Sequence, residues 1–205
     1  MTRSPLPRFV LGDPTPAPVA SDEMRRRLAT RRSASAQCLT GPAPTPDEIS
    51  EILSLGARTP DHGKLFPWRF VVMGPRSRAD LARALAPLAE HQSDPGKAAK
   101  ALSKLTAPPL TILVLSIPVS GHKVPTWEQQ LSAGAVCMNL EHAANALGYS
   151  ASWITDWYSY DPEALSLLGV GPGEQVAGFI HIGCLVEPSL ERPRPDVAAL
   201  TTWRD

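Results

Sequence analysis

The residue types best suited to chemistry gather in two short segments of the first third of the chain. Arg31, Arg32 and Ser33 are consecutive, and Arg58 and His62 follow about one helix further on. A guanidinium group can bind phosphate through two parallel hydrogen bonds, and a hydroxyl and an imidazole add further donors. This combination predicts a binding site for an anion of the size of a phosphate.

The rest of the chain offers no reactive group that would do chemistry alone. It has no Gly-x-Ser-x-Gly nucleophile motif and no Gly-x-x-x-x-Gly-Lys phosphate loop, and neither His122 nor His142 has a partner at metal-binding spacing. Trp153, Ile154 and Thr155 resemble a short strand that ends in a polar group. Cationic anchors and aromatics without a nucleophile favour chemistry carried by a cofactor, and a phosphate-bearing planar molecule such as FMN fits best.

Two weaker motifs leave alternatives open. Asp61 and His62 could be half of a catalytic dyad, or a loop pair that bonds to the backbone, and their spacing alone does not choose. The glycine-rich segment 169–173 superficially resembles a dinucleotide-binding loop. It follows a predicted helix rather than a strand, and Pro172 removes an amide donor, so we do not expect it to bind phosphate.

Composition places the chain among ordinary globular proteins. Of its 205 residues 43% are hydrophobic, and 20 basic residues balance 20 acidic ones, which argues against a general nucleic-acid or acidic-membrane binder. No apolar run reaches membrane-spanning length, and Cys38, Cys137 and Cys184 form no Cys-x-x-Cys motif. We therefore expect a cytoplasmic protein with reduced thiols, no metal site and Cys137 packed in the core. Residues 1–32 carry seven arginines and only three acidic residues. These arginines either serve the anion site or, at Arg25–Arg27, form a solvated helix face.

Proline content and capping signals divide the chain into an extended proline-rich arm over 1–20 and a single domain over 21–205. Ser21 is a predicted N-cap, and Thr45 with Glu48 forms a predicted capping box. The patterning predicts helices over 22–30, 46–59, 77–90 with a break at Pro87, 97–105, 127–147 and 162–168, and strands over 70–73, 110–115, 152–155 and 176–186. The longest helix is rich in small residues, so we expect it at the centre of the fold, with Gly148 as its C-cap. Helices around about four strands, without regular alternation, favour an α+β fold.

Several motifs occur together in an order that resembles the FMN-dependent nitroreductase family, and its small bacterial branch of NAD(P)H nitroreductases in particular. These motifs are Arg31-Arg32-Ser33-Ala34-Ser35, Pro42-Ala43-Pro44, Gly56 to His62, Pro67-Trp68-Arg69-Phe70, Lys123 to Gln129 and Ser132-Ala133-Gly134. With the residues around Gly148 and Trp153, the resemblance covers about residues 24–186. It implies a central, mainly antiparallel sheet surrounded by helices, in an intertwined homodimer with two flavins at the interface.

The resemblance also implies roles for individual residues. Arg31, Arg32 and Ser33 match contacts to the phosphate and the flavin edge of FMN, whereas Arg58 and His62 match positions that bind the FMN of the other subunit. Trp153, Ile154 and Thr155 match a backbone-rich strand beside the flavin. A segment matched to the seating of the nicotinamide donor comprises Ala143, Ala144, Asn145, Ala146, Leu147 and Gly148. Arg194 could add a phosphate contact, or its tail could simply be solvated.

For activity, the resemblance implies a ping-pong oxidoreductase. NAD(P)H would reduce FMN, and an electron-poor acceptor such as a nitroaromatic or a quinone would then take two electrons. The protein would hold the flavin and stabilise charge on it rather than react covalently. Three alternatives stay open: a non-catalytic flavin-binding protein, a flavin-free dimeric interaction protein, and a flavin-linked oxidase or fragmentation enzyme.

Overall fold

The computed structural model describes residues 6–204 and separates into two compact units, which meet in the sequence between Arg32 and Ser33. The smaller unit contains helix α1 (Asp22–Thr30), whose N-cap Ser21 accepts a hydrogen bond from the Met24 backbone N–H at 3.2 Å. This confirms the predicted helix and its cap. Residues 6–20 form no helix or strand, whereas the first five residues of the predicted arm lie outside the described residues. The single domain over 21–205 stays a prediction.

The larger unit is built on a four-stranded sheet with the order β1 (Trp68–Met73), β2 (Leu110–Ser116), β4 (Gln175–Gly183) and β3 (Ser150–Ile154). Every neighbouring pair of these strands is antiparallel, which confirms an α+β fold with a mainly antiparallel sheet. β4 ends earlier than predicted, because Cys184 leaves this sheet to form an isolated bridge with Thr40.

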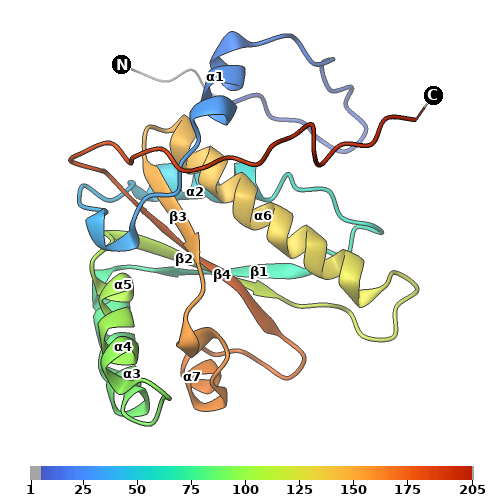
Figure 1. Cartoon of the computed structure of the whole chain (residues 1–205). Helices are drawn as coiled ribbons and strands as arrows, with labels where there is room; N and C mark the ends of the chain where they lie inside the picture. The colour runs from blue at the N-terminus through green and yellow to red at the C-terminus, as the bar shows by residue number, and fades with distance from the viewer. Residues whose placement is uncertain (1–5, 205) are drawn as a thin grey trace. The chain divides into compact units, whose positions relative to one another are not determined.

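Helices cover both faces of the sheet. They are α2 (Pro46–Gly56), α3 (Pro75–Ala89), α4 (Pro95–Ala101), α5 (Ser103–Thr106), α6 (Thr126–Ala146) and α7 (Pro162–Leu167), with short 3-10 turns η1 (Ala36–Cys38) and η2 (Trp157–Ser159). α2 and α6 pack on one face, and α3, α5 and α7 pack on the other (Figure 1). None of the helices within residues 6–204 is long and apolar enough to cross a membrane.

The central strand β2 is buried along its whole length and sends alternate side chains into two cores. Ile112 and Val114 belong to the core beneath α2 and α6, whereas Leu113 and Leu115 belong to the core beneath α3, α5 and α7. Successive side chains of a strand face opposite sides of the sheet, so a strand that is apolar throughout must be covered on both faces. Cys137 is fully buried in the first core, as predicted, and burial raises the pKa of its thiol to about 12.

The longest helix, α6, approaches α2 closely because Gly56 has no side chain. A Cβ atom at Gly56 would lie 2.5 Å from Cδ2 of Leu140 on α6. Just beyond the end of α6, Gly148 has a φ of 90°, in the left-handed region that glycine adopts readily. The close packing of the longest helix and its terminating glycine are therefore confirmed, although the glycine that permits this approach lies on α2 and not on α6.

Three predicted helices differ from the structure by more than one residue at an end. α2 ends at Gly56 and not at Pro60, because the chain turns there and the Thr59 hydroxyl donates to the Gly56 carbonyl. α3 begins at Pro75, since proline suits the first helical turn, and it continues past Pro87 instead of breaking. The helix predicted over 97–105 is two helices, α4 and α5.

Candidate cofactor site

The loop between α2 and β1 carries two of the predicted anchors and is held in a defined shape. The Asp61 carboxylate accepts hydrogen bonds from the backbone N–H groups of Leu65 at 2.8 Å and Phe66 at 3.1 Å. Lys64 and Phe66 have φ values of 56° and 49°, in the left-handed region that non-glycine residues seldom adopt. Such strain persists where surrounding contacts over-determine the backbone, and it is common at functional sites.

Asp61 and His62 do not form a dyad in this structure. Asp61 bonds to the backbone of its own loop, which is one of the two alternatives that the spacing left open. His62 instead meets α6, where its Nδ1 lies 2.7 Å from Oε2 of Glu128. The side chains of His62 and Glu128 are 65% and 38% exposed. His62 therefore has a carboxylate partner and remains accessible to a ligand.

A row of polar side chains along α6 fastens this loop to the core. Glu128, Ser132 and Asn139 are four and seven residues apart, a spacing that places them on one face of a helix. Ser132 Oγ donates to the Pro60 carbonyl at 2.9 Å, and the Asn139 amide donates to Thr59 Oγ1 at 2.8 Å. Together with the Glu128 contact, these bonds hold the loop along about three turns of α6.

The strand β3 presents its backbone rather than its largest side chain. The Trp153 indole packs against Gly134 of α6 and Gly178 of β4. Its Nε1 donates a hydrogen bond to the Ala177 carbonyl at 3.0 Å. The Trp153 indole is thus engaged in contacts within the chain. A ligand at this edge of the sheet would therefore meet the main chain of β3 and the exposed Thr155.

Ser33 opens the larger unit beside the same strand. The backbone N–H of Ala34 donates to the Ala151 carbonyl of β3 at 2.9 Å, so Ser33 and β3 are neighbours. The structure thus brings Ser33 together with the strand that carries Trp153, Ile154 and Thr155. Arg31 and Arg32 are the last residues of the smaller unit, and both are half-buried.

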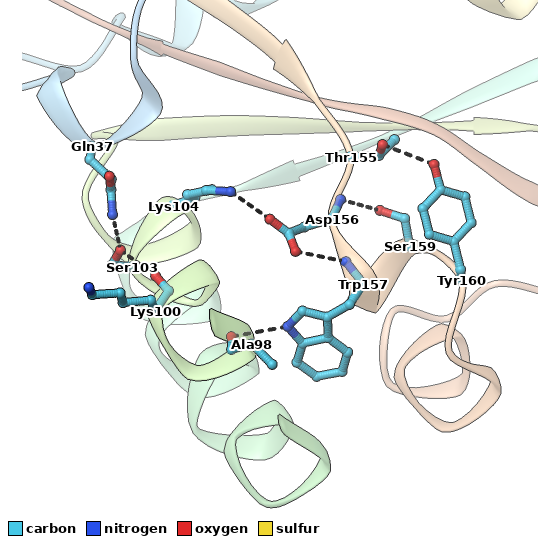
Figure 2. A network of polar contacts seen from close by, with 10 residues as sticks. All are labelled: Gln37, Ala98, Lys100, Ser103, Lys104, Thr155, Asp156, Trp157, Ser159 and Tyr160. Atoms are coloured by element: carbon cyan, nitrogen blue, oxygen red, sulfur yellow. Dashed lines mark hydrogen bonds and ion pairs between the residues drawn. The ribbon is translucent and has the colours of Figure 1, made fainter. Parts of the chain in front are cut away.

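The chain beyond β3 is fastened by a polar network (Figure 2). Thr155 Oγ1 accepts a hydrogen bond from the Tyr160 hydroxyl at 2.9 Å. Asp156 forms an ion pair with Lys104 of α5 at 2.7 Å and also accepts from the backbone N–H of Trp157 at 2.8 Å. These contacts tie the end of β3 to the helices on the second face of the sheet.

The remaining predicted site residues are distributed over the larger unit. Arg58 follows α2 and is exposed. Arg194 pairs with Glu191 at 2.9 Å in the C-terminal tail. Of the helix-end segment 143–148, Ala143, Ala144 and Leu147 are buried. The role of residues 143–148 in seating the nicotinamide stays a prediction.

The glycine-rich segment 169–173 already has a partner within the chain. Glu174 accepts a hydrogen bond from the Gly171 backbone N–H at 2.8 Å and pairs with Arg69 at 2.7 Å, and Arg69 also donates to the Gly169 carbonyl at 2.7 Å. The hydrogen bond with Arg69 lowers the pKa of the Glu174 carboxyl, and the same bond raises the pKa of Arg69. These residues close a turn. The Gly171 N–H already donates to the Glu174 carboxylate and is therefore not available to a phosphate.

Sequence reasoning missed the polar row of α6. It treated the helix as a small-residue packing element and assigned no role to Glu128 or Asn139. The available signal was the shared helical face of three polar residues, one of which, Ser132, is only 6% exposed. A buried polar side chain needs a hydrogen-bonding partner, so such a face predicts a contact with another segment.

Comparison with known proteins adds independent findings. The chain is 36% identical over 157 residues to the Escherichia coli K12 protein named "Putative NAD(P)H nitroreductase YdjA", covering 76% of this chain and 85% of that one. Its fold is similar to that of a nitroreductase-like family protein from Bacillus cereus, with a TM-score of 0.79, 20% identity and coverage of 92% and 100%. It is also similar to a Desulfovibrio desulfuricans protein described as a "putative nitroreductase in complex with fmn", with a TM-score of 0.70, 20% identity and coverage of 91% and 99%.

The antiparallel sheet is covered by helices on both faces, and a polar loop is bound to one of those helices, so the fold is that of an α+β protein. The model of the Nitroreductase family matches residues 28–184, and the chain belongs to this family. The resemblance seen in the motifs is therefore confirmed, as is the prediction of an oxidoreductase of the NAD(P)H nitroreductase type.

Proposed function

We propose that this chain is an FMN-dependent oxidoreductase that uses NAD(P)H to reduce nitroaromatic, quinone or similar electron-poor acceptors by a ping-pong mechanism. Family membership and the FMN named in two structural neighbours support the cofactor and the donor. The observation that carries the proposal is the loop fixed by Asp61 and by the polar row of α6. These bonds fix the chain segment that carries Arg58 and His62.

The residues present fit the two parts of FMN. A phosphate group suits a guanidinium group, which can form two parallel hydrogen bonds to it. Arg31 and Arg32 offer such groups to one FMN, and Arg58 offers one to the FMN of the other subunit. A planar ring suits the edge of β3, where the main chain is available because packing occupies the Trp153 indole. When bound, FMN would supply the two-electron chemistry that the side chains lack. Donors fixed in advance stabilise negative charge beside them without reorganising, which is how Ser33 and the β3 backbone would contribute.

We place this site at the interface of a homodimer. The family resemblance supports this placement, because Arg58 and His62 match positions that bind the FMN of the other subunit. Near His62, large apolar side chains are exposed: Trp127 is 67% exposed, Leu131 is 53% and Phe66 is 59%. Large exposed apolar side chains on α6 and on the loop bonded to it favour a protein interface, and we propose that a second copy of the chain covers them. The cytoplasmic location and the nicotinamide-seating role of residues 143–148 stay predictions.

Anaerobic half-reactions of the purified protein test the activity. NADPH alone should bleach the visible absorption of the FMN-loaded protein, and a quinone added afterwards should restore it. Steady-state rates should give parallel double-reciprocal lines. FMN binding without NAD(P)H oxidation would support the non-catalytic alternative instead, and a protein that stays colourless after incubation with FMN would support the flavin-free one.

Sedimentation velocity tests the dimer. Leu131→Arg should convert the dimer to monomers, because it places a charge in the apolar contact. Leu167→Arg is the matched control, since Leu167 is 49% exposed on α7, away from the polar row of α6. A monomeric parent protein, or a Leu131→Arg variant that stays dimeric, would contradict the proposed interface.

A further inference from the structure

We propose that Glu128 is the positioning residue for His62. Its carboxylate holds the imidazole as the Nδ1–H tautomer, so Nε2 is the ring nitrogen presented to the cofactor. That this cofactor is FMN rests on the proposed function, whereas the tautomer of His62 rests on the geometry of its contact with Glu128 alone. The imidazole then serves as an acceptor for a hydroxyl or N–H group of FMN when it is neutral, and the phosphate is left to the arginines.

The tautomer follows from the chemistry of the two groups. An ionised carboxylate only accepts hydrogen bonds, so the 2.7 Å contact between Glu128 Oε2 and His62 Nδ1 requires the proton to be on Nδ1. A neutral imidazole has one N–H group, and a bond at one ring nitrogen therefore decides the role of the other. Nε2 of neutral His62 must carry the lone pair.

Both partners are attached to rigid backbone. Glu128 lies in the first turn of α6, where the helix dipole favours a negative charge. Its neighbour Gln129 is 2% exposed and anchors the preceding loop, accepting from the Val119 N–H at 2.8 Å and donating to the Val124 carbonyl at 3.0 Å. His62 follows Asp61, which fixes the loop from the other side. The backbone on both sides of this 2.7 Å contact is thus held by hydrogen bonds of the neighbouring residues.

A structural role and a positioning role make different predictions at this pair. An exposed ion pair contributes little to stability, about 0–1 kcal/mol, and both side chains here are substantially exposed. Removing the carboxylate should leave the unfolding transition almost unchanged. It should nevertheless release the imidazole to its solution preference, in which the proton is mainly on Nε2.

The direct test is long-range proton–nitrogen NMR of histidine-labelled protein without FMN, at a pH where His62 is neutral. His62→Asn assigns the signal among the five histidines. We expect the Nδ1–H pattern in the parent protein and a shift towards Nε2–H in Glu128→Ala, which removes the acceptor, whereas the Gln carbonyl of Glu128→Gln can still accept from Nδ1–H. Glu90→Gln, at the exposed end of α3, is the control and should keep the parent pattern. An Nε2–H pattern in the parent, or no change in Glu128→Ala, would overturn the proposal.

FMN titration supplies the second readout. Glu128→Ala should weaken FMN binding about threefold to tenfold, the effect of one ordinary hydrogen bond, with an almost unchanged thermal transition. Parent-like affinity in a variant whose tautomer has changed would overturn the positioning role. A parent protein that binds no FMN would contradict the proposed function instead, and the NMR pattern would still decide the tautomer.

Discussion

Replacing Gly178 by alanine tests whether the packing of Trp153 sets the position of β3. A Cβ atom at Gly178 would lie 2.1 Å from Nε1 and 2.3 Å from Cδ1 of Trp153, far closer than van der Waals contact. The indole would have to move, and it would lose its hydrogen bond to the Ala177 carbonyl. Overpacking costs about 1–3 kcal/mol and a lost hydrogen bond about 0.5–1.5 kcal/mol, so we expect the free energy of unfolding to fall by about 2–4 kcal/mol.

Urea denaturation followed by far-ultraviolet circular dichroism measures this loss. Gly96→Ala is the matched control, because Gly96 is exposed within α4 and alanine there should raise the free energy of unfolding by up to about 1 kcal/mol. The decisive comparison repeats Gly178→Ala in a Trp153→Ala background, where the clash is gone and the cost should fall below about 0.5 kcal/mol. Equal losses in both backgrounds, or no loss in either, would refute the reasoning.

Three further perturbations have expected outcomes. Burial, reinforced by Arg78 and Lys104, lowers the pKa of His181 from 6.5 to about 3, so its contribution to stability is complete above pH 6.5 and is lost as the pH falls towards 3. Denaturant titrations across that range should show a slope of at most about 1.4 kcal/mol per pH unit from this group, and His181→Gln should remove it. Asp156→Ala removes the cap of η2 and the partner of Lys104, and urea titration should show a loss of about 1–2 kcal/mol, whereas Lys104→Met should lose less than about 1 kcal/mol. Arg31→Ala should weaken FMN binding tenfold or more in a fluorescence titration, since a hydrogen bond to a charged group contributes about 1.5–3 kcal/mol; unchanged affinity would remove Arg31 from the site.

The start of α2 was predictable from the sequence because a nearby side chain caps it, whereas α4 begins two residues before its predicted start although Asp94 caps it. The Thr45 hydroxyl accepts from the Glu48 N–H at 3.3 Å, and Glu48 returns a bond to the Thr45 N–H at 2.9 Å, so both partners lie within one turn. α3 has no side-chain cap after Gly74, and its start was predicted two residues too late. Buried strands were equally visible, because an apolar run such as β2 needs no knowledge of its neighbours.

The contacts that position the candidate site could not be read in the same way. His62 and Glu128 are 66 residues apart, and their meeting depends on how the α2–β1 loop lies along α6. The approach of Trp153 to Gly178 likewise depends on the register of β3 on β4, which a single sequence does not encode locally. Types of residue near a site were thus predictable, whereas the partners that orient them were not.

The contact between His62 and Glu128 and the packing of Trp153 both involve α6. Its polar face, from Glu128 to Asn139, holds the loop that carries His62, and its Gly134 receives the indole that occupies the side of β3. A helix packed this closely cannot shift at one contact without shifting at the other, because protein interiors are packed at crystal-like density. If the loop serves the FMN of one subunit and β3 that of the other, α6 is the rigid link between the two sites. Small residues in this helix are then needed for the geometry of the cofactor site as much as for the stability of the core.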